Sequence, residues 1–156
     1  MDYSNKLIVS LKIIIIILII FGLWNSLIIG ASWDEPFHAN DGMRRLRYLI
    51  SFGENKNYQH PNSQFYPGLY DTFSASISYF FYKFYPNFYG NFFFNTKHFI
   101  NFIFATFSIY GLYSFIKLFT KNELLALLSS LFTMLNPFFF GHIGINPKDI
   151  ICLLYT

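Results

Sequence analysis

The chain has 156 residues, enough for one small domain, but its composition is not that of a water-soluble protein. Hydrophobic residues make up 54% and aromatic residues 23%, whereas charged residues make up 12%, against about 25% in typical globular domains. A chain of this size has too little interior to hide 22 Phe and 12 Tyr side chains, so we expect a lipid bilayer to be a partner. The net charge of +3 is small and scattered, which argues against nucleic acid, and the single cysteine excludes an internal disulfide framework.

The sequence predicts a first membrane-spanning helix over about 7–29. Residues 13–31 carry no charge, and about 20 apolar residues cross the hydrocarbon core of a bilayer as a helix. A cleavable signal peptide is the alternative, with Lys6 and Lys12 as its basic region and 30–32 as its exit. The apolar cores of signal peptides are usually about 7–15 residues long, so a retained span is the better interpretation.

A polar cluster, Trp33-Asp34-Glu35-Pro36-Phe37-His38, follows this span directly. Its two carboxylates are on adjacent residues, so their side chains point in different directions. One can face a substrate while the other is held in the wall of the site. A carboxylate beside the membrane can accept a proton from an attacking hydroxyl or amine, which is the work of a general base. A solvated loop acid or a helix cap is the alternative function of either side chain.

His38 follows Asp34 by four residues, which places both on one helical face if Pro36 opens the first turn. This spacing permits the two side chains to share a divalent metal ion, although nothing in the sequence requires one. A hydrogen-bonded histidine is the simpler interpretation.

A second helix is predicted to start at 40–42, where an Asn or Asp side chain can accept from free backbone N–H groups, and to run to about Phe52. Its apolar residues recur at helical spacing while its arginines gather toward the other side, so it can lie in the membrane interface. Two functions remain open for the arginines. They rest among lipid headgroups, or Arg44 or Arg47 holds the phosphate of a lipid-linked substrate in a bidentate manner.

The stretch 69–96 contains no uncharged segment that is long enough to cross a membrane. Asp71 and the lysines divide it into short uncharged pieces, and Pro86 and Gly90 break the second piece. Both pieces suit helices that lie along the interface. The alternative, a crossing by 69–85, would move everything downstream to the opposite face of the membrane.

Two further spans are predicted over 98–116 and 124–141. Lys117 and Lys121 lie in or beside the turn between them, and positive charge in short loops marks the cytoplasmic side. The N-terminus and this turn are therefore expected to be cytoplasmic. The sequence predicts an all-α, multi-pass protein of the plasma (inner) membrane, with a non-cytoplasmic helical loop over 30–97.

Asn136-Pro137 is predicted to end or kink the third span, and a second polar cluster, Asn146-Pro147-Lys148-Asp149, precedes the start of a fourth near 150. With three spans before it, Asp149 lies on the same non-cytoplasmic face as Asp34, where the two acids can form one site. Taken alone, Asp149 is more simply a helix cap that pairs with Lys148.

Together these features resemble the membrane-embedded glycosyltransferases of the GT-C type, in particular the protein O-mannosyltransferase-like (family 39) and aminoarabinose-transferase-like proteins of bacteria. The family pattern begins with a first span followed directly by Asp-Glu, here Asp34-Glu35. A helical loop with a Tyr-Pro element comes next, similar to Tyr66-Pro67-Gly68-Leu69-Tyr70. A helical hairpin and a Pro-containing stretch then lead to the second acid, which matches Asp149.

The resemblance implies that the chain is the N-terminal part of an enzyme that moves a sugar from a polyprenyl phosphate to a protein or glycolipid acceptor. Transfer would occur on the non-cytoplasmic face, with inversion at the anomeric carbon. Asp34 matches the acid that orients or deprotonates the acceptor, and Asp149 matches the second acid of the site. Family members have many more spans, and their later loops bind the lipid phosphate, so the present chain alone is expected to be inactive.

The candidate catalytic residues are Asp34, Glu35 and Asp149, and the candidate substrate-binding residues are His38, Arg44, Arg47, Tyr66 and Lys148.

Two other classes of protein are alternatives. A small non-catalytic membrane protein, or an inactive remnant, would use its acids as helix caps and its arginine helix as a lipid anchor. A transporter fragment would carry intramembrane charges along a substrate path. The predicted cores of the three spans lack such charges, which argues against the transporter.

Overall fold

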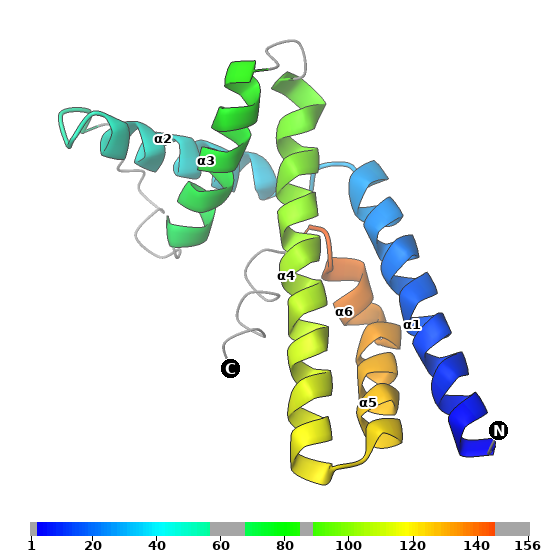
Figure 1. Ribbon diagram of the computed structural model, residues 1–156. Coiled ribbons are helices and arrows are strands. Elements are labelled where there is room, and N and C mark those ends of the chain that lie inside the picture. The colour runs from blue at the N-terminus through cyan, green and yellow to red at the C-terminus, as the bar shows by residue number, and fades with distance from the viewer. Residues whose placement is uncertain (1–2, 57–67, 85–88, 146–156) are drawn as a thin grey trace. The chain divides into compact units, whose positions relative to one another are not determined.

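The structure, a computed structural model, describes residues 3–56, 68–84 and 89–145, the last of these without the side chains of 89–93. Every secondary-structure element within these ranges is a helix, which confirms the predicted all-α class for the described part of the chain (Figure 1). The helices are α1 (Tyr3–Ile28), α2 (Glu35–Ile50), α3 (Gly68–Phe84), α4 (Tyr89–Thr120), α5 (Glu123–Leu135) and α6 (Pro137–His142).

The chain divides into two compact units, which are described separately below. Residues 1–29 and 101–156 form the first, here called the bundle unit, and residues 30–100 form the second, here called the loop unit. Helix α4 contributes its first turns to the loop unit and the remainder to the bundle unit.

Two helices of the described chain are long and apolar enough to cross a membrane. They are α1, with a mean hydropathy of 2.9, and Phe94–Thr120 of α4, with a mean hydropathy of 1.6. Helix α1 is apolar around its whole circumference, as expected of a helix that water does not surround. The predicted segment 98–116 lies within α4. The predicted segment 7–29 overlaps α1, which begins four residues earlier, at Tyr3, and ends one residue earlier, at Ile28.

The core of the bundle unit forms where α4, α5 and α6 meet. Phe102, Ala105 and Ile109 of α4 pack against Met134 of α5 and Phe139 of α6, all of them nearly inaccessible to solvent. One side of α1 packs against this cluster through partly buried residues that recur at helical spacing, Ile15, Leu18, Ile19 and Leu23. Close van der Waals packing of these side chains holds the helices of the unit together.

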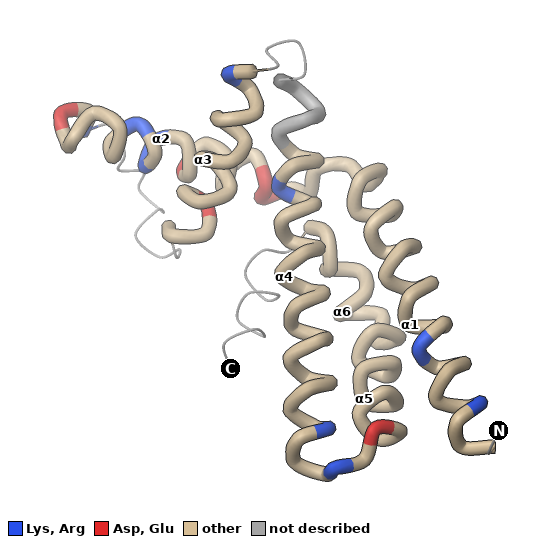
Figure 2. Tube along the Cα trace, viewed as in Figure 1, with Lys and Arg blue, Asp and Glu red and all other residues tan. Residues whose placement is uncertain are grey.

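The two ends of the bundle unit differ in chemistry. At one end, the Lys12 ammonium lies 2.7 Å and the Lys117 ammonium 3.5 Å from the Glu123 carboxylate. Figure 2 shows basic and acidic positions near the turn between α4 and α5. At the other end, Ser26 of α1 packs closely against Gly144, whose carbonyl accepts a 2.9 Å hydrogen bond from Asn101. Helix α1 therefore runs parallel to α5 and α6, so the chain leaves α1 and α6 at the same end of the unit.

Glu123 makes the stability of this unit depend on pH. The hydrogen bond from Lys12, supported by the charge of Lys117, holds the pKa of the Glu123 carboxyl below its usual value. The stabilisation is therefore complete above the usual carboxyl pKa and is lost as the pH falls through the lowered value. We expect Glu123→Gln to lower the melting temperature in detergent slightly at neutral pH, because the pair is partly exposed, and not at all in strong acid. An equal loss at both pH values would contradict this account, and Glu54→Gln, at an exposed acid of the loop unit, is the control.

The predicted third span is divided into two helices. Helix α5 ends at Leu135, and the Asn136 side chain caps α6 by accepting from the backbone N–H groups of Phe138 and Phe139 at 2.9 and 3.4 Å. Pro137 opens α6, where its missing N–H costs no helical hydrogen bond. The break predicted at Asn136-Pro137 is confirmed, whereas an unbroken helix over 124–141 is not observed.

The predicted start of α2 at 40–42 is wrong. The helix begins at Glu35, with Pro36 in its first turn, because proline is already set to the helical φ and needs no hydrogen-bond acceptor. The prediction for Pro36 is thus confirmed. Asp41, expected to cap the helix, lies in its second turn and pairs with Arg45, whose Nε donates to Asp41 Oδ2 at 2.8 Å.

The prediction of two short helices within 69–96 is correct for the first helix and wrong for the second. Its first piece is the separate helix α3, as expected. Its second piece is not a separate helix, because α4 begins at Tyr89 and continues without interruption through Lys97. Lys97 therefore lies inside a long helix and does not mark the boundary of one.

Helices α2 and α3 approach each other closely within the loop unit. The buried face of α3 consists of Asp71 and three small residues, Ser74, Ala75 and Ser78, at helical spacing. Gly42 of α2 lies directly against the Asp71 carbonyl, and a Cβ there would overlap that backbone oxygen. The small side chains bring the two backbones together and thereby set the positions of the polar residues described next.

Candidate functional site

The buried face of α2 is largely polar. Its buried residues recur at spacings of three and four along the helix and are Glu35, His38, Asp41, Gly42 and Leu46. The apolar residues Leu49 and Ile50, by contrast, are 58% and 57% exposed. The loop unit is therefore organised around a cluster of charged and polar side chains from α2, α3 and the first turns of α4, here called the polar cluster.

The adjacent acids Asp34 and Glu35 point in different directions, as predicted. The Asp34 side chain is 55% exposed and accepts a 3.0 Å hydrogen bond from the Ser32 hydroxyl. Glu35 is fully buried, and its Oε2 accepts from the Ser32 backbone N–H at 2.6 Å. Asp34 therefore faces outward, while Glu35 is held in the wall of the unit.

Glu35 forms a closed pair with His98, 63 positions further along the chain. The His98 Nε2 and Glu35 Oε1 atoms are 2.7 Å apart, and both side chains are fully buried. A carboxylate only accepts hydrogen bonds, so His98 donates to it through Nε2 when Glu35 is ionised. The pair fixes the start of α2 against the first turns of α4.

His38 lies between two other carboxylates. Its Nδ1 is 2.7 Å from Asp71 Oδ2 of α3, and both side chains are buried. Its Nε2 is 3.8 Å from Asp34 Oδ2, one helical turn earlier. The predicted common face of Asp34 and His38 is thus confirmed, and Asp71 is the residue that orients the imidazole.

Lys97 places a positive charge beside the buried acids. Its Nζ is 3.9 Å from Asp71 Oδ1, and its side chain is 1% exposed. Arg45 supplies a second cation at Asp41. Buried charges are tolerated when they are paired, and in the polar cluster the carboxylates lie beside lysine, arginine and histidine side chains.

Tyr70 adds a neutral polar group to this environment. Burial raises the pKa of its phenol well above the usual value of 10.0, and the Asp71 and Glu35 carboxylates raise it further. The phenol therefore keeps its proton at neutral and moderately alkaline pH.

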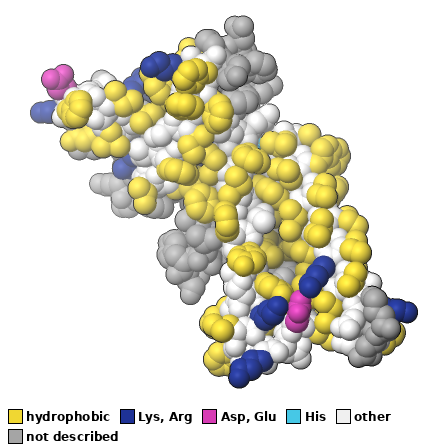
Figure 3. Space-filling model, viewed as in Figure 1, with side chains coloured by type: hydrophobic (Ala, Val, Ile, Leu, Met, Phe, Trp, Pro, Cys, Tyr) yellow, Lys and Arg dark blue, Asp and Glu magenta, His cyan; other side chains and the backbone are white. Residues whose placement is uncertain are grey.

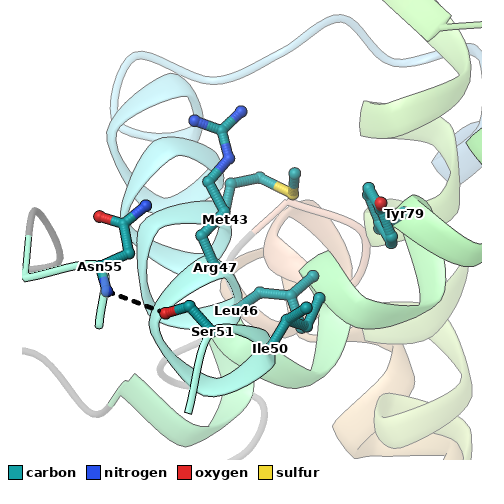
Figure 4. A pocket seen from close by; sticks show the side chains of 7 residues that line it. All are labelled: Met43, Leu46, Arg47, Ile50, Ser51, Asn55 and Tyr79. Atoms are coloured by element: carbon teal, nitrogen blue, oxygen red, sulfur yellow. Dashed lines mark hydrogen bonds between the residues drawn. The ribbon is translucent and has the colours of Figure 1, made fainter. Parts of the chain in front are cut away.

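The predicted phosphate-binding arginines are accessible. Arg44 and Arg47 are exposed on α2, and Arg47 lines a hollow of about 390 Å³ with the apolar residues Met43, Leu46 and Ile50 (Figure 4). Tyr79 of α3 forms the opposite wall of this hollow. The remaining predicted site residues, Tyr66, Lys148 and Asp149, lie outside the described residues, so the structure leaves the predicted pairing of Asp34 with Asp149 untested.

Among residues 3–56, 68–84 and 94–145, no group of three or more His, Cys, Asp or Glu side chains is arranged to hold a metal ion. The Asp34–His38 pair, which the sequence left open as a divalent-metal site, therefore lacks a third such ligand in the described chain.

Sequence reasoning missed Asp71, Lys97 and His98 as members of the site. Lys97 was used only to mark the end of an apolar stretch, and Asp71 only to divide one. A signal was present, because Lys97-His98 ends a polar run, Asn95-Thr96-Lys97-His98, in a helix that is apolar over most of its remaining length. Intramembrane or juxtamembrane ionisable residues in such a setting usually have partners.

No protein-family model matches the chain, and comparisons with curated proteins and with solved structures found no match.

Proposed function

We propose that the chain is the N-terminal part of a GT-C type membrane glycosyltransferase, with Asp34 as the base that receives the acceptor proton. The observation that carries this proposal is the contrast between Asp34 and the other acids of the polar cluster. Asp34 is 55% exposed at the start of α2, whereas Glu35 and Asp71 are buried and paired with histidines. A general base must reach its substrate, and this arrangement leaves Asp34 accessible while its neighbours hold it in place.

The proposed reaction transfers a sugar from a polyprenyl phosphate to a protein or glycolipid acceptor. Asp34 removes the proton from the attacking hydroxyl or amine as that group forms a bond to the anomeric carbon. The bond between the anomeric carbon and the phosphate oxygen breaks, and the polyprenyl phosphate leaves with the electron pair. Attack from the opposite side of the sugar ring inverts the anomeric centre. Arg44 or Arg47 would hold a phosphate, and Asp149 would be the second acid.

The surface of the bundle unit supports a membrane location. Large apolar side chains along α1 remain between 52% and 62% exposed, namely Ile13, Ile16, Ile17 and Ile20. Figure 3 shows hydrophobic side chains over much of the visible face. At one end of the bundle unit, Lys12 and Lys117 lie beside Glu123. Lipid removes this apolar surface from water, and the charged end fits the cytoplasmic headgroups. We therefore propose three spans, formed by α1, α4 and α5 with α6, and a cytoplasmic N-terminus.

The topology can be tested by cysteine labelling in intact cells, on a Cys152→Ser background. We expect Trp33→Cys and Pro147→Cys to react with an impermeant maleimide from outside, because both follow spans that end on the non-cytoplasmic face. Phe119→Cys, at the exposed end of α4, should react only after the membrane is opened. Labelling of position 33 but not 147 in intact cells would contradict the shared face.

The activity itself is tested with membranes that contain the complete product of the gene. We expect these membranes to transfer labelled mannose or aminoarabinose from the corresponding polyprenyl phosphate to endogenous protein or glycolipid. Membranes from cells without the gene are the control. Equal transfer by both membranes would contradict the proposed function.

A non-catalytic membrane protein is the second candidate function. The buried pairs Glu35–His98 and Asp71–His38 favour it, because they connect the helices of the loop unit whether or not a reaction takes place. Retention of the cellular function after replacement of both Asp34 and Asp149 would support this alternative.

A further inference from the structure

We propose that Asp71 and His38 are a positioning pair for Asp34. Asp71 orients the His38 ring, and the buried imidazole receives the proton that Asp34 takes from the acceptor. The chemical purpose of this pair rests on the proposed function. The arrangement of the three side chains can be tested without it.

Two carboxylates lie at opposite edges of the His38 imidazole ring. Asp71 Oδ2 lies 2.7 Å from His38 Nδ1, with side-chain exposures of 4% and 3%. Asp34 Oδ2 lies 3.8 Å from Nε2, and its side chain is 55% exposed. The buried acid therefore holds the ring, and the opposite nitrogen faces the acid that can meet a substrate.

Asp71 also determines which ring nitrogen carries the proton. An ionised carboxylate can only accept, so the 2.7 Å contact places the proton of neutral His38 on Nδ1. Nε2 then presents its lone pair toward Asp34. A carboxylate that orients a histidine through Nδ1 and stabilises the imidazolium that forms is a recurring arrangement in general-base catalysis.

The remaining charged groups at this place favour the same role. Lys97 of α4 lies 3.9 Å from the second oxygen of Asp71 and balances its charge in the buried position. Tyr70 remains a protonated phenol beside the two buried carboxylates. The charged groups beside His38 and its partner include Asp34, Asp71 and, through Asp71, Lys97.

The proton balance is simple. Asp34 accepts the proton from the acceptor hydroxyl or amine and becomes a neutral carboxylic acid. A small movement that closes the 3.8 Å separation allows this proton to pass to His38 Nε2. Asp34 is then a carboxylate again, and the new imidazolium lies between two carboxylates.

The Glu35–His98 pair shows what a purely structural pair in this unit looks like. Both of its side chains are fully buried and are joined directly through Nε2. His38, in contrast, has one nitrogen on a buried acid and the other toward an exposed acid. Packing alone does not require an exposed carboxylate, Asp34, beside the second nitrogen of His38.

The first test reads the proton position directly. In the full chain labelled with ¹⁵N-histidine in detergent micelles, loss of one signal in His38→Gln assigns that residue among the four histidines. At alkaline pH we expect the proton of wild-type His38 on Nδ1, and in Asp71→Asn on Nε2, because the asparagine amide can donate to Nδ1. The control Glu54→Gln removes an exposed acid of the loop unit and should leave the His38 signals unchanged. The same ring proton in wild type and Asp71→Asn would overturn the proposal.

The second test measures transfer by the complete gene product. Asp71→Asn is expected to lower kcat about 100-fold with little change in KM, since a general base contributes about 10²–10⁴-fold. Asp71→Glu, which keeps the carboxylate, should recover part of the loss, while Glu54→Gln, at an exposed acid outside the polar cluster, should keep the wild-type kcat. Failure of the wild type to transfer sugar would overturn the proposed function, whereas full kcat in Asp71→Asn would overturn the positioning pair alone.

Discussion

Replacement of Glu35 by alanine is expected to destabilise the loop unit by about 1–3 kcal/mol, the usual cost of leaving a buried hydrogen-bonding group without its partner. Glu35 accepts hydrogen bonds from the Ser32 backbone N–H and from His98, both at distances below 2.8 Å. Its loss leaves the fully buried His98 ring without this partner and removes the acceptor that holds the chain before α2. Chemical denaturation in detergent, followed by circular dichroism, measures the effect.

Three comparisons make the Glu35 measurement specific. His98→Ala should cost a similar free energy, and the Glu35→Ala/His98→Ala double variant should cost less than the sum of the two, because one interaction is removed in all three. Glu35→Gln, which can still accept from His98, is expected to lose less than Glu35→Ala. Glu54→Ala, at an exposed acid, should remain within about 0.5 kcal/mol of wild type. Strict additivity of the single losses would contradict the direct pair.

Replacement of Gly42 by alanine is expected to destabilise the same unit by about 1–3 kcal/mol, the range typical of overpacking. The added methyl group would overlap the Asp71 carbonyl oxygen and lie 3.1 Å from the Ala75 Cβ. The obstructing oxygen belongs to the backbone, so α2 and α3 must separate. The separation should also disturb the Asp71–His38 contact and therefore lower transfer.

Gly111 provides the matched control for this variant. It lies in α4, and a Cβ added there would meet no described atom within 4 Å. Gly111→Ala should therefore stabilise the protein by about 0.5–1 kcal/mol through helix propensity. The two Gly→Ala changes are thus expected to have opposite signs in the free energy of unfolding. A neutral Gly42→Ala would contradict the close approach of α2 and α3.

The apolar helices could be predicted from the sequence because their signal is local. Runs without charge predicted the end of α1 to within one residue and placed the second apolar segment inside α4. The break at Asn136-Pro137 was equally clear, since proline cannot continue a helix with the usual hydrogen bonds. Local chemistry alone decides such features.

The start of α2 was mispredicted because two helix-start signals competed. Asn40-Asp41-Gly42 resembles a cap, but Pro36 in the first turn determines where the helix begins. Asp41 therefore lies inside the helix and pairs with Arg45 one turn later. An aspartate four residues before an arginine can lie either at the start of a helix or inside it. The Asp41–Arg45 spacing therefore does not show whether the helix begins at Glu35 or at Asp41.

The polar cluster could be predicted only in part. Asp34, Glu35 and His38 were identified as candidates, because each lies directly after a span. Their partners Asp71 and His98 lie 33 and 63 positions away from the residues that they contact. Contacts over such separations depend on how helices pack, and the small residues of α3 that permit this packing carry no chemical signal of their own.

The most direct test of the central claim is sugar transfer by the complete gene product carrying Asp34→Asn. The amide keeps the shape of the side chain but cannot accept the acceptor proton, so we expect transfer to fall by about 10²–10⁴-fold, with membrane insertion unchanged. Glu54→Gln, at another exposed acid of the loop unit, should transfer sugar at the wild-type rate. Transfer by Asp34→Asn at the wild-type rate would contradict the assignment of Asp34 as the base.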